Sequence, residues 1–241
     1  MKHLLSVLLC TLCLCASCDD GRIPEKVRDL NEKGRTAQLE ADLSGVDSWS
    51  KNYSVVFAGF TDDGTYAEIS KDIKPDANGH VSLALAGIPD DVTKLEVCVI
   101  NSIRKRIATF YTINTSEATE VDDTLRISPT APIAVSSMYA TIQTQIFDKQ
   151  CAHCHSGSPW AASLNLNDGA SYDQIVNVAS SKMAGKARVT PGDADNSVLY
   201  EALSTSVSLD NSWNFNHSNI MATDYNGLKL IKDWIDDGAK R

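Results

Sequence analysis

The stretch Ala37-Gln38-Leu39-Glu40-Ala41-Asp42-Leu43 alternates apolar and polar residues without interruption. A period of two is typical of a β-strand that buries one face. Short strands are also predicted at 53–60, 66–73, 80–86, 95–100, 107–113 and 124–127. Turn-forming clusters such as Thr61-Asp62-Asp63-Gly64 separate them. This regular spacing predicts an antiparallel β-sandwich domain over residues 36–128, in which we find no catalytic constellation.

After a linker at 129–135, the apolar period becomes helical. Ser136 or Ser137 can cap a helix whose apolar residues follow at helical spacing: Met138, Ile142, Ile146 and Phe147. Later helix starts are predicted at Ser171, Asp195 or Asn196, and Thr223. Residues 136–241 are therefore expected to form an all-α second domain. Its side chains are too few for a self-sufficient core, which predicts that a large bound group supplies the missing apolar volume.

The most specific motif is Cys151-Ala152-His153-Cys154-His155. Two cysteines separated by two residues, with a histidine directly after the second, form the attachment sequence for c-type haem. Cys151 and Cys154 can form thioether bonds to the haem vinyl groups within one turn of chain. His155 then lies under the ring, where its imidazole binds the iron. The motif predicts one covalent haem c.

Two other interpretations of this motif were considered. A Cys-x-x-Cys pair can form a redox disulfide, but that chemistry is usual in a βαβ context, whereas here an amphipathic helix precedes the motif. The pair could also be half of a zinc site, completed by His153, His155 or His217. A structural zinc site usually recruits a second cysteine pair, and no cysteine follows Cys154 in the sequence.

The N-terminus predicts export from the cytoplasm. Lys2 is followed by a short apolar run that ends in small residues, so residues 1–17 are typical of a signal peptide. The segment Cys15-Ala16-Ser17-Cys18 resembles a bacterial lipobox, with Cys15 where leucine is usual. This resemblance implies that Cys18 is lipidated and anchors the chain in the cell envelope. The alternative is ordinary cleavage, which gives a soluble periplasmic protein. Residues 18–35 are expected to form a charged tether.

The chain is acidic, with 22 Lys and Arg against 31 Asp and Glu and a net charge of −9. Such a surface argues against a nucleic-acid partner and would steer a basic redox partner toward the protein. Once the signal, lipid and haem cysteines are assigned, only Cys98 remains. It lies in an apolar run and is expected to be a small buried hydrophobe, so no disulfide framework is available.

Residues 136–239 resemble the class I c-type cytochromes, specifically their small planctomycete-type haem domains. The landmarks follow in order: Phe147, the 151–155 motif, Leu164-Asn165-Leu166, Pro191-Gly192-Asp193, Ser197–Tyr200, Met221 and Trp234–Ala239. The resemblance implies that the first and last helices cross where Phe147 meets Trp234. Two positions depart from the family pattern: Gln143 stands where a glycine is expected, and Ala222 follows Met221 where proline is frequent.

The resemblance also implies further site residues. Met221 occupies the place of the thioether ligand on the distal side of the iron, and His217 and Met183 are the alternatives. The Pro191 carbonyl is expected to accept a hydrogen bond from His155. Trp160 and Leu164 are expected to wall the haem edge.

These features predict a membrane-anchored mono-haem cytochrome, a one-electron carrier or electron-transfer module of the bacterial envelope. No acid–base pair, nucleotide-binding loop or nucleophile triad is visible, so bond-making catalysis is not expected. One alternative is a surface lipoprotein that binds a glycan or a protein through the β-domain and carries an accessory haem domain. Another is a haem-based sensor or enzyme whose sixth iron ligand is displaceable.

Overall fold

The computed structural model describes residues 34–205 and 215–241. The predicted signal peptide at 1–17, the predicted lipidation site Cys18 and all but the end of the tether lie outside the described residues. Among the described helices, none combines the length and the apolar character needed to cross a membrane.

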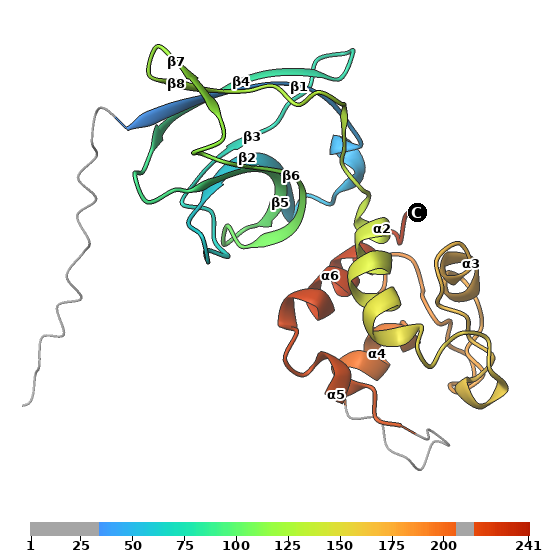
Figure 1. Ribbon diagram of the computed structural model, residues 1–241. Coiled ribbons are helices and arrows are strands. Elements are labelled where there is room, and N and C mark those ends of the chain that lie inside the picture. The colour runs from blue at the N-terminus through green and yellow to red at the C-terminus, as the bar shows by residue number, and fades with distance from the viewer. Residues whose placement is uncertain (1–33, 206–214) are drawn as a thin grey trace, which may run out of the picture. The chain divides into compact units, whose positions relative to one another are not determined.

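One sheet is built around the strand that the opening stretch predicts. Its order is β4-β1-β8-β7, and β9 pairs with the far end of β1 (Figure 1). The strands are β1 (Arg35–Ser44), β4 (His80–Ile88), β7 (Thr119–Val121), β8 (Thr124–Ile127) and β9 (Ile133–Ala134). Leu39 stands opposite Leu83 of β4 and Ile127 of β8. Every second residue, Ala37, Leu39, Ala41 and Leu43, is buried, which confirms the predicted alternation.

The second sheet has the order β3-β2-β5-β6 and is antiparallel throughout. Its strands are β2 (Tyr53–Phe60), β3 (Ile69–Asp72), β5 (Lys94–Asn101) and β6 (Arg106–Asn114). Both faces of β2 and β5 are buried. One face joins the main core, while Cys98, Phe60 and Ile100 belong to a separate cluster on the other face. Arg106 closes that cluster by pairing with buried Glu96 at 2.6 Å. The predicted burial of Cys98 is confirmed.

The helices are short and are separated by long irregular segments. They are α2 (Met138–Ile142), the π-helix η3 (Gln143–Cys151), α3 (Ser171–Ile175), α4 (Val198–Ser204), α5 (Ser218–Met221) and α6 (Tyr225–Asp236), with 3₁₀ turns η2 (Val46–Ser48) and η4 (Pro159–Ala161). Ser137 caps α2 as predicted, accepting from Ala140 N at 3.2 Å. The last helix is capped by Asp224 instead of Thr223.

The predicted fold class, an antiparallel β-sandwich followed by an all-α cytochrome c-like haem domain, is wrong. The structure is 33% strand and 24% helix, with two sheets and five short α-helices in the described ranges, and no all-α haem domain is evident there. The first sheet is mixed, because β8 and β9 run parallel to β1. Beyond Cys151 the backbone turns repeatedly through positive φ at Ala162, Ser163 and Asn177, which interrupts helix formation.

The prediction that Ser171 caps the start of a helix is also wrong. Ser171 is the first residue of α3 and not its cap, and the helix ends at Ile175. The Ser171 hydroxyl is buried and hydrogen-bonded to the side chains of Gln143 and Tyr139, so it cannot bind the backbone of α3. The third helix begins after Ser197 instead of Asp195 or Asn196.

A buried polar contact joins β2 to α6. The Tyr53 hydroxyl donates to Asp233 Oδ2 at 2.8 Å, and Lys229 lies 2.5 Å from the same oxygen. Burial raises the pKa of Tyr53, as does the bond to Asp233, so its hydroxyl remains a donor throughout the neutral range.

Replacing Tyr53 with Phe removes this donor and keeps the ring. We expect the free energy of unfolding to fall by about 1.5–3 kcal/mol, the range for a hydrogen bond to a charged group. Urea denaturation followed by circular dichroism measures the change. Tyr66→Phe is the matched control, because Tyr66 is 48% exposed. Equal losses in the two variants would contradict the role assigned to the Tyr53–Asp233 bond.

Candidate haem-attachment site

The Cys-x-x-Cys-His segment begins at the C-terminal end of η3. Ala152 N donates to Phe147 O at 2.8 Å, a bond spanning five residues that is characteristic of a π-helix. Cys154 N and His155 N then both donate to Cys151 O, at 3.1 and 2.9 Å. The two cysteines and the histidine therefore occupy one tight turn, as thioether attachment to a single porphyrin requires.

Both cysteines are free thiols, but their surroundings differ. Cys151 is 8% exposed and belongs to the main apolar core, whereas Cys154 is exposed. Burial raises the pKa of Cys151 to about 11. A redox-active Cys-x-x-Cys pair relies on a thiol with a lowered pKa. The Cys151 environment is thus opposite to that of a thiol–disulfide catalyst.

His155 is half-buried, and its ring is oriented by a backbone group. Nδ1 lies 3.2 Å from Ala161 O. Because a carbonyl only accepts, Nδ1 carries the proton and Nε2 keeps its lone pair, which is the usual arrangement of a metal-binding imidazole. Burial lowers the pKa of His155; the bond to Ala161 acts in the opposite direction, and the charge of Arg188 lowers it further. The lone pair is therefore available at neutral pH.

The backbone around His155 is held by a hairpin-like loop. His155 O accepts from Leu166 N at 2.8 Å, and Gly157 N donates to Leu164 O at 2.9 Å. Ser156 and Asn165 form a bridge between these two bonds. The 3₁₀ turn η4 lies at the tip of this loop and presents the Ala161 carbonyl to the His155 ring.

Gln143 ties this loop to the helix. It is 2% exposed, and its Nε2 donates to Leu166 O at 2.9 Å and to Asp148 Oδ1 at 2.7 Å. Its Oε1 accepts from the hydroxyls of Ser171 and Tyr139. A buried amide is tolerated only when its polar atoms are bonded, and here both ends are satisfied. Gln143, which stands where the resemblance leads one to expect glycine, thus holds the loop after the 151–155 motif against η3 and α3 by hydrogen bonds.

A second imidazole lies beside the first. The ring centroids of His155 and His217 are 5.8 Å apart, and the ring planes differ by 30°. Phe215 contacts His217 edge-on, with centroids 5.4 Å apart. Burial lowers the pKa of His217, nearby His155 lowers it further, and a hydrogen bond with the Phe215 backbone opposes both.

The predicted thioether ligand Met221 lies in the core. It is 2% exposed, and a Cβ placed on Gly227 would lie 3.0 Å from its methyl group. Met183 is half-buried in a turn, where its backbone N–H donates to Ser180 Oγ at 3.1 Å. Ligation by either methionine stays a prediction.

The structure places the remaining predicted residues on separate segments. Trp160 belongs to η4 and is 67% exposed. Leu164 lies further along the same loop and packs against the main core. Pro191 lies half-buried in a turn before α4. Their contacts with a haem stay predictions. The carbonyl that faces His155 Nδ1 in the structure is that of Ala161.

The first and last helices are joined through an aromatic residue that the sequence did not single out. Tyr139 contacts Phe147 with centroids 6.4 Å apart and Trp234 with centroids 5.2 Å apart. All three rings are buried. The predicted meeting of Phe147 and Trp234 is therefore mediated by Tyr139.

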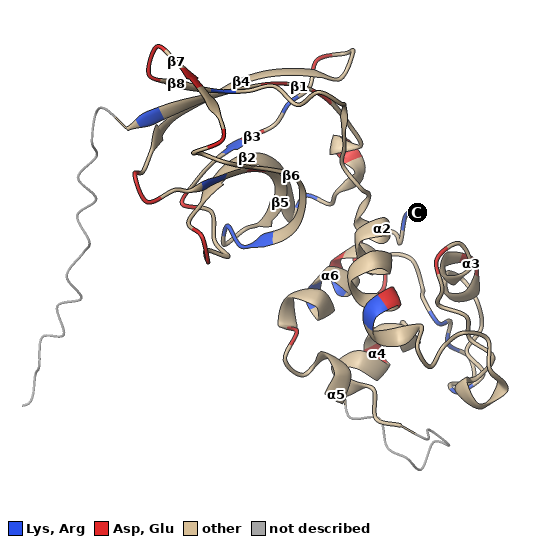
Figure 2. Cartoon of the chain, in the orientation of Figure 1, with Lys and Arg blue, Asp and Glu red and all other residues tan. Residues whose placement is uncertain are grey.

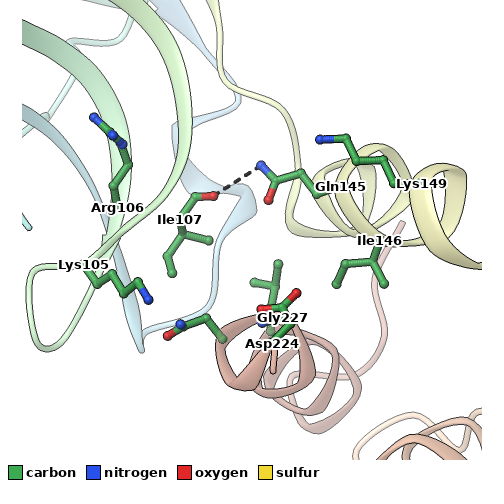
Figure 3. Close-up of a pocket in the computed structure, with 10 residues that line it drawn as sticks. Lys105, Arg106, Ile107, Gln145, Ile146, Lys149, Asp224 and Gly227 are labelled. Carbon is green, nitrogen blue, oxygen red and sulfur yellow. Dashed lines mark hydrogen bonds between the residues drawn. The ribbon is translucent and has the colours of Figure 1, made fainter. Parts of the chain in front are cut away.

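A shallow cavity of about 280 Å³ lies between β6 and the helices η3 and α6 (Figure 3). Gln145 Nε2 donates across it to Ile107 O at 3.3 Å, shown as the dashed line. Ile107, Ile146 and Leu230 supply its apolar lining. Within 34–205 and 215–241, no three His, Cys, Asp or Glu side chains are grouped to hold a metal ion.

Sequence reasoning named Gln143 only as a departure from the family pattern and missed its buried hydrogen bonds, and it did not identify Ala161. The signal for Gln143 was a polar amide among apolar residues at helical spacing, which indicates a buried and fully bonded side chain. Ala161 acts through its carbonyl, so no side-chain pattern could have identified it.

Comparison of the chain with protein-family models, with characterised proteins and with solved structures finds no match.

Replacing Gln143 with Met removes both ends of its hydrogen-bond network while preserving length and burial. We expect the free energy of unfolding to fall by about 2–4 kcal/mol, because buried polar partners lose their bonds. Chemical denaturation of the haem-free protein measures this loss. Gln150→Met, on the half-buried side of the same helix, is the control and should change stability little. Equal stability of the two variants would show that the tie is unimportant.

The cysteines of the haem-free protein should differ in reactivity. Cys154 is exposed, whereas the raised pKa of about 11 and the burial of Cys151 suppress its thiolate at neutral pH. Alkylation with iodoacetamide at pH 8, followed by peptide mass mapping, should modify Cys154 at least about tenfold faster than Cys151. Faster labelling of Cys151 would contradict the burial assigned to its thiol. Cys98, buried and with a raised pKa, serves as the slow reference.

Proposed function

We propose that the protein carries one covalent haem c and acts as a one-electron carrier or electron-transfer module of the bacterial envelope. The observation that carries the proposal is the turn 151–155, in which two free thiols precede His155, whose Nδ1 faces the Ala161 carbonyl. Cys151 and Cys154 would hold the porphyrin, and His155 Nε2 would bind the iron. When bound, the haem supplies reversible one-electron chemistry.

The chain's own residues support this chemistry in distinct ways. The Ala161 carbonyl fixes the tautomer of His155, and such a hydrogen bond also raises the basicity of a ligating imidazole. Leu166 N–H fixes the backbone of His155, and Gln143 fixes Leu166. The chain itself therefore holds the His155 imidazole in the orientation that a metal ligand would need.

The two thiols lie on opposite sides of the boundary between core and solvent. Cys151 is in the apolar core and Cys154 is exposed. Cys151 would attach the group beside buried apolar side chains, and Cys154 would attach it near solvent. An accessible edge is what an electron-transfer partner needs, and exposed Trp160 lies on the neighbouring turn η4.

The charge of the chain supports a basic partner. Its net charge is −9, and acidic residues gather at the β7–β8 hairpin (Figure 2), where Glu120 lies in β7 and Asp122 and Asp123 form the exposed turn. Electrostatic attraction of a basic protein raises the association rate and weakens with salt. A lipid on Cys18 would keep the protein at the membrane where such partners work.

Production of the full chain in bacteria with a cytochrome c maturation system should yield covalent haem. Intact mass should increase by one haem, and the pyridine haemochrome spectrum should be that of two thioether bonds. The double variant Cys151→Ala/Cys154→Ala should lose the covalent haem entirely. Cys98→Ala is the matched control and should retain it, since Cys98 lies in the separate cluster of the second sheet. Unmodified thiols in the exported wild-type protein would refute the proposal.

A further inference from the structure

We propose that His217 is the second axial ligand, so that His155 and His217 bind the iron from opposite sides. This inference rests on the proposed function. The sequence left Met221, Met183 and His217 open as the second ligand, and the inference selects His217. The sixth ligand position of the iron would then be filled by the protein.

The spacing of the two rings carries the inference. A nitrogen of a ligating imidazole lies about 2 Å from a first-row metal ion, so two imidazoles on opposite sides of one ion have centroids about 6 Å apart. The His155 and His217 centroids are 5.8 Å apart, with ring planes 30° apart. His155 and His217 come from distant segments, yet both rings are half-buried at one place.

The segment that carries His217 is ordered by its own side chains. Phe215 packs edge-on against the imidazole, with ring planes at 88°. Asn216 Oδ1 accepts from Ser218 N at 3.2 Å and from Ser218 Oγ at 2.9 Å, which closes the turn into α5. Ile220 N donates to His217 O at 3.0 Å. His217 is therefore presented from a defined turn that faces His155.

Met221 has a packing role in the core. Its side chain is 2% exposed and belongs to the main core. Gly227 of α6 leaves room for the Met221 methyl, since a Cβ at that position would lie only 3.0 Å from it.

Two imidazole ligands have a defined chemical consequence. A thioether ligand raises the reduction potential of a cytochrome, so replacement of the thioether by a second imidazole places the potential lower. Both axial positions are then filled by protein nitrogen atoms. Small gaseous ligands must displace one of them to bind, which suits electron transfer and not gas sensing.

The test uses the full-length protein with covalent haem and compares His217→Ala with Met221→Leu. The wild-type ferric protein should be low-spin, should lack the near-infrared thioether-to-iron band and should bind carbon monoxide poorly when reduced. His217→Ala should lose the low-spin spectrum and gain carbon monoxide binding, and added imidazole should restore the low-spin spectrum. Met221→Leu should keep the wild-type spectrum, because Leu fills a similar volume.

A second variant keeps the test decisive if His217→Ala folds poorly. His217→Met should retain six-coordinate iron, acquire the thioether band and shift the midpoint potential upward. A thioether band in the wild-type protein that disappears in Met221→Leu would overturn the inference while leaving the haem proposal intact. A wild-type protein without covalent haem would overturn both, and the pyridine haemochrome assay separates these two results.

Discussion

The buried amide of Gln143 is the interaction on which the arrangement of the cysteine segment depends. An amide removed from water costs free energy unless its donors and acceptor are bonded. Here the amide bonds to the Leu166 carbonyl on one side and to the Ser171 hydroxyl on the other. Leu166 N–H in turn holds the His155 carbonyl. One side chain thereby joins η3, the loop of His155 and the start of α3, which have little regular structure of their own.

The π-helix that carries Gln143 also decides how the two thiols are exposed. Its wider turn places the Phe147 carbonyl opposite Ala152 N, and both Phe147 and Cys151 face the core. The chain then tightens, because Cys154 N and His155 N both bond to the Cys151 carbonyl. Within one turn the chain passes from the apolar interior to solvent. π-Helical turns are uncommon and are frequent at functional sites, which agrees with the chemistry proposed for this one.

The strands could be predicted because alternation is a local property of the sequence. The expected strands at 53–60 and 124–127 agree with β2 and β8 to the residue. The parallel pairing of β8 and β9 with β1 could not be predicted, since the choice of partner strand depends on residues far apart in the chain. The helices were overestimated for a related reason. The Ser171 motif satisfies the local rule for a helix start, but its hydroxyl is bound by Gln143, which no local rule includes.

The candidate site shows the same division between local and distant information. Cys151, Cys154 and His155 were predicted as a haem-attachment site because covalent attachment demands those residues in that spacing. The approach of His217 to His155 depends on how a distant turn folds back, and the packing of Met221 depends on the absence of a side chain at Gly227. Position along the chain favoured the methionine, whereas the arrangement in space favours the histidine. If the proposed haem binds there, two imidazoles already positioned by the chain would hold its iron. The hydrogen bonds of Gln143 and Leu166 would keep His155 in place, and the contact with Phe215 would keep His217 in place. Both would favour electron transfer at an iron site whose ligands stay bound.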